Sequence, residues 1–213
     1  MKASFWHDRW ENDQIAFHES RPNPLLLAHF TALSLPPKSR VFVPLCGKSL
    51  DIPWLLSQGY RVAGAELSRK AIGQLFDTLG LTPHITQEGK LERFRAENLD
   101  IFVGDIFDLL SETLGHVDAI YDRAALVALP EPMRERYVKH VMAITKRAPQ
   151  LLICYEYDQR LQEGPPFSIS RDEVVRHYHA AYTPNVLAEV EVPGGLKGKC
   201  AAIETVWLLT KHR

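Results

Sequence analysis

The sequence predicts an α/β fold with a mostly parallel sheet of seven strands, helices on both faces and an antiparallel C-terminal strand. Two observations predict it. Apolar strand-like runs alternate with helical patterns along most of the 213 residues, which is typical of parallel strands joined by crossover helices. The last two strand-like runs, 185–192 and 202–210, are joined by a loop too short for such a helix, so we expect them to pair antiparallel.

The elements of the first half are identified from their ends and their periodicity. Pro24 occupies the first turn of a helical pattern that closes before Pro36 and Pro37. Ser68 caps a second pattern, in which apolar residues recur at spacings of three and four up to Gly80. The expected elements are a helix from Pro24, a strand over 40–45, a helix over 50–58, a strand over 60–67 and a helix from Ser68 to Gly80.

The second half continues this alternation. Its strand-like runs are short and apolar, and two of them end in an acidic residue. Helical periodicity appears between and after the runs. The expected elements are strands over 100–105, 117–122 and 150–155, helices over 130–146 and 170–182, and the final strand pair.

Composition and charge narrow the function classes. The net charge is −1, so no excess positive field favours nucleic acid. The three cysteines are far apart and form no CxxC pair, which favours free thiols in the cytoplasm over disulfides or a zinc site. The sequence contains neither a signal-peptide core nor an uncharged run of about 18 residues. We therefore expect a cytoplasmic monomer with one domain over residues 1–213 that binds neither nucleic acid nor a membrane.

The turn after the first strand is the first candidate for a ligand site, because ligands bind beyond the carboxyl ends of strands in open α/β sheets. The PLCGKS segment, residues 44–49, ends like a phosphate-binding loop, but Phe42 stands where that loop needs its first glycine. A dinucleotide turn needs three glycines, and only Gly47 is present. The segment therefore favours a ligand without a phosphate group.

Acidic residues at the next strand ends indicate an adenosine ligand. Glu66 follows Gly47 by about 20 residues, the spacing at which an acid meets the ribose hydroxyls of NAD or S-adenosylmethionine. A solvated or capping carboxylate is the alternative, and the missing pyrophosphate turn favours S-adenosylmethionine. Asp105 and Ile106 lie where the adenine would come, and they are equally compatible with a helix cap and a core residue.

Two further motifs have a functional and a structural interpretation. Asp122 and Arg123 end the fourth strand before an apolar stretch, which predicts opposite charges in a partly dry pocket or a purely structural ion pair. Trp6 and Trp10, four residues apart, present one face of the N-terminal arm. That face either fixes the arm to the domain or covers a cationic sulfonium. The nine histidines form no metal-binding pattern, so we expect no metal.

Taken together, the motifs resemble the thiopurine S-methyltransferase family, in particular its bacterial branch. The similarity covers nearly the whole chain, through the aromatic arm, PLCGKSLD, GAELS, YDRA, YDQ and GPPFS. It implies a Rossmann-like class I methyltransferase fold, with residues 1–23 as a lid over S-adenosylmethionine. It also implies a thiol acceptor, or a selenium or tellurium species. By resemblance, the cofactor contacts Trp10, Leu45, Glu66 and Arg123, with Trp6, Asp105 and Ile106 contributing, and the acceptor borders Phe17, Pro166 and Phe167.

The resemblance leaves the acceptor and the mechanism partly open. Lys197 and Lys199 stand where the resemblance leads us to expect arginines, so the acceptor preference is expected to differ. We expect no catalytic residue, because methyl transfer needs the reacting atoms to be aligned and water to be excluded. Aromatic thiols also ionise readily, which lessens the need for a general base. The alternatives are an NAD-dependent oxidoreductase and a non-catalytic S-adenosylmethionine-binding protein.

Overall fold

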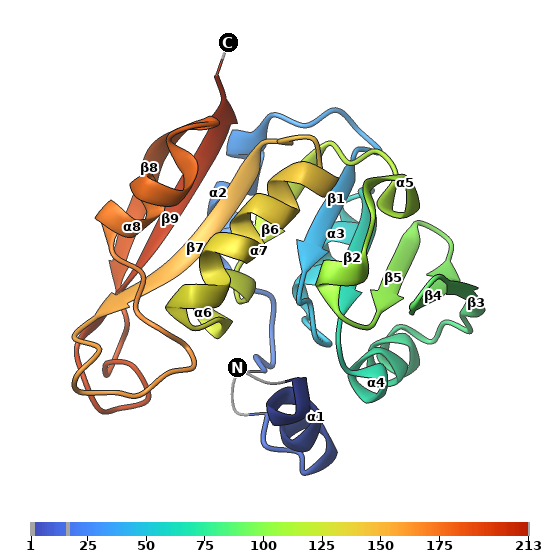
Figure 1. Ribbon diagram of the computed structural model, residues 1–213, viewed down its shortest axis with the longest axis horizontal. Helices are drawn as coiled ribbons and strands as arrows, with labels where there is room; N and C mark the ends of the chain where they lie inside the picture. Colours follow the sequence, from blue (N-terminus) through green and yellow to red (C-terminus); the bar gives the residue numbers. More distant parts are fainter. Residues whose placement is uncertain (1–2, 16–17, 213) are drawn as a thin grey trace.

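The computed structural model describes residues 3–15 and 18–212, whose strands form one mixed sheet (Figure 1). Nine strands in these residues follow the order β3-β4-β5-β2-β1-β6-β7-β9-β8. The five strands from β5 to β7 in this order pair in parallel, which confirms the predicted parallel core. They are β1 (Arg40–Pro44), β2 (Arg61–Glu66), β5 (Leu99–Val103), β6 (Ala119–Asp122) and β7 (Gln150–Tyr157).

The central strand β1 shows why its sequence is almost wholly apolar. All five of its residues are buried. Val41 and Val43 pack into the core on one face of the sheet, whereas Phe42 packs into the core on the other. A parallel strand covered on both faces has no solvent side, so its apolar residues do not alternate with polar ones.

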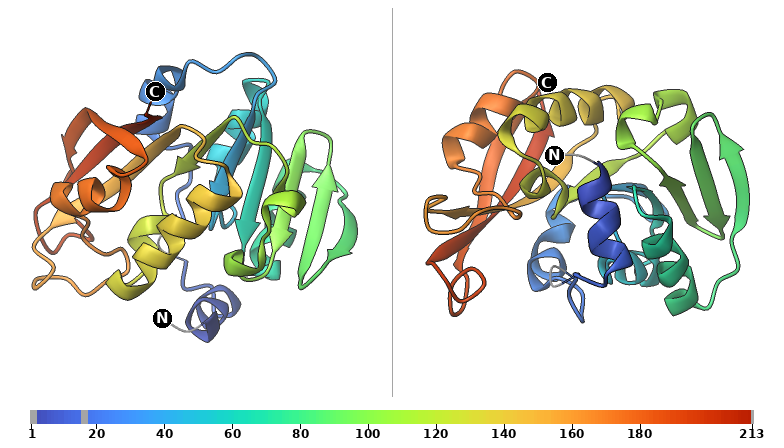
Figure 2. Two further views of the ribbon diagram at one scale, coloured as in Figure 1. Left: turned by 45° about the horizontal axis from the view of Figure 1, so that its top comes forward. Right: turned by 60° about the horizontal axis from the view of Figure 1, so that its bottom comes forward.

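Helices cover both faces, as the alternation of elements predicts (Figure 2). Apolar residues of α2 (Pro24–His29), η1 (Phe30–Leu33), α3 (Asp51–Ser57) and α4 (Arg69–Leu79) fill one core. The other core is formed with η2 (Ile106–Asp108), α5 (Ser111–Leu114), α6 (Ala125–Ala128), α7 (Glu131–Ile144) and α8 (Arg171–Tyr178). No helix in the described residues is long and apolar enough to cross a membrane.

The chain ends in the expected antiparallel strands. β9 (Ala202–Lys211) lies between β7 and β8 (Tyr182–Glu191), antiparallel to both. β8 starts three residues before the predicted 185, because α8 already ends at Tyr178 and Tyr182 pairs with Lys211. The register shifts between Val186 and Ala188, a local irregularity that periodicity cannot reveal.

The sheet has nine strands rather than the seven expected. The two additional strands, β3 (His84–Glu88) and β4 (Leu91–Ala96), form a hairpin that extends the sheet antiparallel to β5. None of the five β3 residues is buried, because β3 is an edge strand, where polar and charged side chains are common. Their polarity resembles a loop more than a buried strand, which is why the apolar pattern did not predict them.

The N-terminal arm forms a helix outside the sheet. Helix α1 (Ala3–Glu11) lies across the edge at which the parallel strands end (Figure 2, right). Only Trp10 among its residues is buried. The aromatic face predicted for the arm is therefore directed toward the strand ends, where a ligand site is expected.

Candidate active site

A cavity of about 1180 Å³ lies between α1 and the carboxyl ends of the parallel strands. It is lined by Glu66, the last residue of β2, and by Leu45, Asp105 and Arg123 from the turns that follow three other parallel strands. Tyr155 near the end of β7 adds a side chain from the fifth strand. The structure thus brings together the residues that the strand-end rule singled out.

The turn after β1 is shaped by two residues with a positive φ. Leu45 has a φ of 46° and Gly47 a φ of 51°, and the N–H of Cys46 donates to the carbonyl of Ala65 at 3.0 Å. A Cβ at Gly47 would lie 3.1 Å from a ring carbon of Trp10. Both the backbone conformation and the close approach of Trp10 therefore require glycine here.

Glu66 joins this turn to the next element. Its carboxylate accepts the N–H of Gly47 at Oε2 and the N–H of Ser68 at Oε1, each at 2.8 Å. Burial raises the pKa of Glu66, and the backbone hydrogen bonds from Ser68 and Gly47 oppose that rise. A carboxylate has about four acceptor positions, so Glu66 can still accept hydrogen bonds from hydroxyl groups in the cavity.

Asp122 and Arg123 do not form the charge pair considered from the sequence. The Asp122 carboxylate accepts the N–H groups of Ala125 and Leu126 and the hydroxyl of Tyr137, the last at 2.6 Å. Burial raises the pKa of Asp122 to about 6. The Asp122 side chain thus fixes the first turn of α6, while Arg123 lines the cavity.

Arg123 pairs instead with the N-terminal arm. Its Nη2 lies 3.3 Å from Oε1 of Glu19, and the Arg123 side chain is 14% exposed. Within the part of the chain that the structure describes, its buried Nε has no hydrogen-bond acceptor. Arg123 therefore presents an unused donor beside the cavity.

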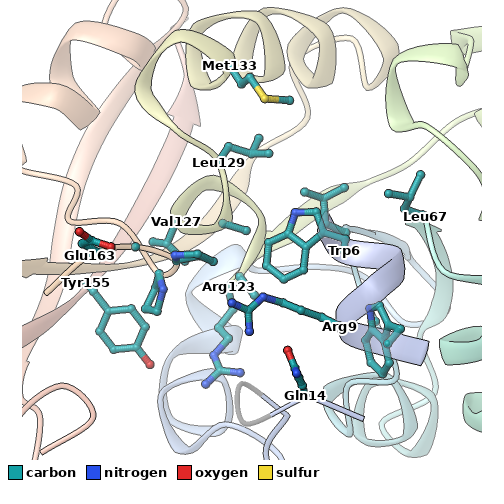
Figure 3. A pocket seen from close by; sticks show the side chains of 18 of the residues that line it. Trp6, Arg9, Gln14, Leu67, Arg123, Val127, Leu129, Met133, Tyr155 and Glu163 are labelled. Carbon is teal, nitrogen blue, oxygen red and sulfur yellow. The ribbon is translucent and has the colours of Figure 1, made fainter. Parts of the chain in front are cut away.

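Helix α1 supplies the opposite wall of the cavity. Figure 3 shows Trp6 and Arg9 extending from α1 into the cavity, which Arg123 also lines. The Arg9 guanidinium lies over the ring of Phe5, 4.4 Å from its centre. Its Nε is also buried, with no acceptor among the described residues. Trp6 and Trp10 both line the cavity, a position compatible with either interpretation of the aromatic face. Arg9 is a cavity residue that the sequence analysis missed.

Asp105 and Ile106 line the cavity as well. Asp105 is exposed and caps η2 by accepting the N–H of Phe107 at 3.0 Å, and Ile106 is buried. Asp105 is therefore a helix cap and Ile106 a core residue, and both also line the cavity. Phe107 and Met133 lie in the same wall, but no local sequence signal distinguishes them from core residues.

The residues predicted to border the acceptor have different positions. Pro166 lines the cavity. Phe167 is not among the lining residues: its N–H donates to the carbonyl of Val127 at 2.6 Å, and its ring packs against Gly164. Phe17 lies outside the described residues.

Two loops close the far end of the cavity. The loop after β7 contributes Glu163 and Pro165, and the loop between β8 and β9 contributes Lys197. The Lys197 Nζ donates to the carbonyl of Pro165 at 2.8 Å, which joins the two loops. Burial lowers the pKa of Lys197, and nearby Arg9 acts in the same direction. No group of three potential metal ligands occurs in the described residues.

The chain resembles known proteins over its whole length. A family model described as Thiopurine S-methyltransferase (TPMT) matches residues 1–211. The chain is 55% identical over 212 residues to a thiopurine S-methyltransferase of Xanthobacter autotrophicus, covering 99% of this chain and all of the relative. It is 50% identical over 212 residues to one of Teredinibacter turnerae, covering 100% of this chain and 99% of the relative.

A solved structure supports the fold assignment. The chain is similar to the 1,6-didemethyltoxoflavin-N1-methyltransferase of Burkholderia thailandensis, whose structure contains 1,6-didemethyltoxoflavin and S-adenosylhomocysteine. The TM-score is 0.65 at 15% identity, and the match covers 98% of this chain and 87% of the other. At this level of identity, the similarity shows a shared fold, which confirms the class I methyltransferase architecture.

Proposed function

Because the chain belongs to the thiopurine S-methyltransferase family, we propose that its cavity binds S-adenosylmethionine beside Glu66 and methylates an aromatic or heterocyclic thiol. The chain is an S-adenosylmethionine-dependent methyltransferase. The binding residues and the acceptor are the proposed parts. The observation that carries the proposal is the Glu66 carboxylate, which faces the cavity while bonding to the Gly47 turn.

The donors and acceptors of the cavity fit an adenosyl ligand without phosphate. A phosphate at the turn would need the N–H of Gly47, which is already donated to Glu66, and it would face a carboxylate. Free acceptor positions on Glu66 suit ribose hydroxyls. The unused Nε groups of Arg9 and Arg123, considered within the described residues, suit a carboxylate such as that of an amino acid. We assign Leu45, Asp105, Ile106, Trp6 and Trp10 to the same site, since all line the cavity.

S-adenosylmethionine supplies an electrophilic methyl group on a positively charged sulfur. The protein has to align the acceptor with this group and to exclude water. Trp6 and Trp10 cover the strand ends from α1, and aromatic faces attract a cation by about 0.5 to 2 kcal/mol. Residues 1–23 are therefore proposed as a lid on this site.

The far end of the cavity suits an anionic acceptor. Lys197 and Lys199 line it together, and the Lys199 charge adds to the burial and the Arg9 charge that lower the pKa of Lys197. Cations held close to one another favour an anion between them, and an aromatic thiol readily ionises to a thiolate. Val127 and Leu129 supply apolar contacts for a ring. Selenium and tellurium species are proposed as further acceptors because they are soft nucleophiles as well.

The cellular context is also proposed. The net charge of −1 favours a small-molecule acceptor over nucleic acid. The described thiols, Cys46, Cys154 and Cys200, are free and buried, as is usual in the reducing cytoplasm. We propose a cytoplasmic monomer.

An acceptor screen tests the proposed function. The protein is incubated with methyl-labelled S-adenosylmethionine and, separately, with a thiopurine, thiophenol, benzeneselenol or phenol. We expect label in the sulfur and selenium products and none in phenol, because the harder oxygen nucleophile is mostly protonated at neutral pH. Tight cofactor binding without S-adenosylhomocysteine formation from any acceptor would instead indicate a non-catalytic binding protein.

A further inference from the structure

A tyrosine that borders the cavity and an acid lie side by side on neighbouring strands. Tyr155 on β7 and Glu204 on β9 are direct partners in the antiparallel register, so their side chains lie on the same face of the sheet. Tyr155 lines the cavity, and Figure 3 shows its ring at the end where Arg123 lies. Glu204 is not a lining residue, so Tyr155 is the member of this pair that borders the cavity.

The Glu204 carboxylate has an unused acceptor in a dry position. Its Oε1 is buried and accepts no hydrogen bond from the described residues. The titratable and charged groups that act on Glu204 include Tyr155 on β7, Arg123 after β6 and Glu19 on the arm. Tyr121 on β6 also interacts with the Glu204 charge, which adds to the effect of burial in raising the pKa of Tyr121. On the β8 side its register partner is Val190, which carries no charge.

These surroundings favour proton uptake by Glu204 rather than by Tyr155. Burial raises the pKa of Glu204, while Tyr155 and Arg123 lower it. Burial and then the Glu204 charge raise the pKa of Tyr155 to about 12, with Arg123 opposing. Tyr155 therefore stays a neutral hydroxyl at ordinary pH, able both to donate and to accept a hydrogen bond, whereas Glu204 is the group able to take up a proton.

We propose that Tyr155 and Glu204 form a proton relay that lets the enzyme use weakly acidic thiols, which bind as neutral S–H groups. This inference rests on the proposed function and deepens it, because an acidic thiol that binds already ionised does not need the relay. Tyr155 is the residue that touches the acceptor. Glu204 acts through it.

The proton and electron balance of the relay is complete. The acceptor S–H proton passes to the Tyr155 oxygen while the Tyr155 hydroxyl proton passes to the Glu204 carboxylate. The electron pair left on the acceptor sulfur forms the bond to the methyl carbon. The bond between that carbon and the sulfonium breaks, and its electron pair neutralises the sulfonium. Glu204 later loses its proton to water.

The test compares the pH dependence of two thiols. Benzyl mercaptan is a weakly acidic thiol, whereas 4-nitrothiophenol is ionised at neutral pH. With the native protein, kcat/KM for benzyl mercaptan should level off once Glu204 is ionised. With E204Q or Y155F it should be about 100-fold lower at pH 7 and should rise about tenfold per pH unit, following the free thiolate. For 4-nitrothiophenol, both variants should stay within about twofold of the native protein.

E156Q is the matched control, because Glu156 is the exposed neighbour of Tyr155 in sequence and points to the other face of the sheet. It should keep the native profile with both thiols. Calorimetric titration with S-adenosylhomocysteine and the thermal midpoint establish that E204Q and Y155F are folded and bind the cofactor product.

Three results would overturn the inference. One is that kcat/KM for benzyl mercaptan depends on pH in both variants as it does in the native protein. Another is an equal loss with both thiols accompanied by weaker binding of S-adenosylhomocysteine, which would make Tyr155 and Glu204 positioning residues for Arg123. If the native protein methylates neither thiol, the proposed function itself fails, and the inference fails with it.

Discussion

At the scale of single residues, the proposed cofactor site depends on backbone shape as much as on side chains. The N–H of Gly47 is held by Glu66, and Trp10 lies against the α-carbon of this glycine. The residues at strand ends, such as Leu45 and Arg123, were predictable because the strand-end rule depends only on element order. The partners of Asp122 and Arg123 were not, because they depend on where α6 and the arm pack.

Gly47→Ala should lower both stability and cofactor affinity. A side chain at a positive φ costs about 1 to 2 kcal/mol, and the new Cβ would lie 3.1 Å from Trp10. Gly80→Ala is the matched control, because Gly80 has a φ of 64° with no atom within 4 Å of the added Cβ. Thermal unfolding should show a loss of stability in both variants. Only Gly47→Ala should bind S-adenosylhomocysteine more weakly in calorimetry. Equal affinities would contradict the close approach of Trp10.

Glu66→Ala should weaken S-adenosylmethionine binding by about 1 to 3 kcal/mol, because the ribose hydroxyls lose their charged acceptor. Glu66→Gln keeps the shape and one acceptor oxygen, so it should fall between the native protein and the alanine variant. Glu97→Gln changes an exposed acid outside the cavity and should bind normally. Unchanged calorimetric affinity in Glu66→Ala would remove Glu66 from the site.

Asp122→Asn should change how stability depends on pH. The folded pKa of Asp122, about 6, is above its ordinary value of 3.8. The stability gained by protonating Asp122 is therefore fully present below about pH 4 and is lost as the pH rises through about 6. The difference between the folded pKa and the ordinary pKa of Asp122 corresponds to about 3 kcal/mol in the free energy of unfolding. Relative to the Asn variant, the native protein should gain stability in urea unfolding between pH 7.5 and 4.5, and parallel curves would contradict the assignment.

At the scale of elements, periodicity predicted the parts that have two buried faces. The five parallel strands and the main helices follow apolar patterns that one local rule can recognise, as in β1 and α4. The β3-β4 hairpin follows no such rule, because its exposed side carries charged residues and its pairing with β5 is a tertiary contact. Tyr155 lies at the end of a predicted strand, so the strand-end rule could have identified it. Arg9 could not be identified in this way, because its place in the cavity depends on where α1 packs.

The hairpin is tied to the sheet by a charge cluster around Asp100. Its Oδ1 lies 2.9 Å from Arg93 and 3.0 Å from Arg95 of β4, and its Oδ2 lies 3.0 Å from Arg40 of β1. Burial alone would raise the pKa of Asp100, but hydrogen bonding to Arg95 and the other arginine charges lower it overall. The ion pairs therefore stabilise the fold above the unfolded pKa of this carboxyl and are lost as the pH falls through its lowered folded value.

Asp100→Asn should destabilise the protein at neutral pH by about 1 to 3 kcal/mol, since three arginines lose one shared carboxylate. Asp77→Asn, at an exposed acid of α4, is the control and should have little effect. Urea unfolding at pH 7 gives the comparison. A loss no larger than that of Asp77→Asn would show that the cluster is only a solvated surface pair.

At the scale of the whole molecule, function comes from segments far apart in the sequence meeting at one sheet edge. The arm, the turn at Gly47, the acid at Glu66 and the two C-terminal loops all border the same cavity. The sequence motifs predicted the strand-end residues that line this cavity, because their positions follow from the order of the elements. The proposed acceptor side is formed by loops whose positions no local pattern fixes. Of the two predicted acceptor residues within the described part of the chain, Pro166 lines the cavity and Phe167 does not.

A crystal structure of the complex with S-adenosylhomocysteine tests the central claim most directly. The account predicts the ribose hydroxyls within about 3.2 Å of the Glu66 carboxylate and the amino-acid carboxylate beside Arg123. The sulfur should point toward the end of the cavity that contains Tyr155. Density for the compound in another part of the molecule, or an adenosyl group with no contact to Glu66, would contradict it.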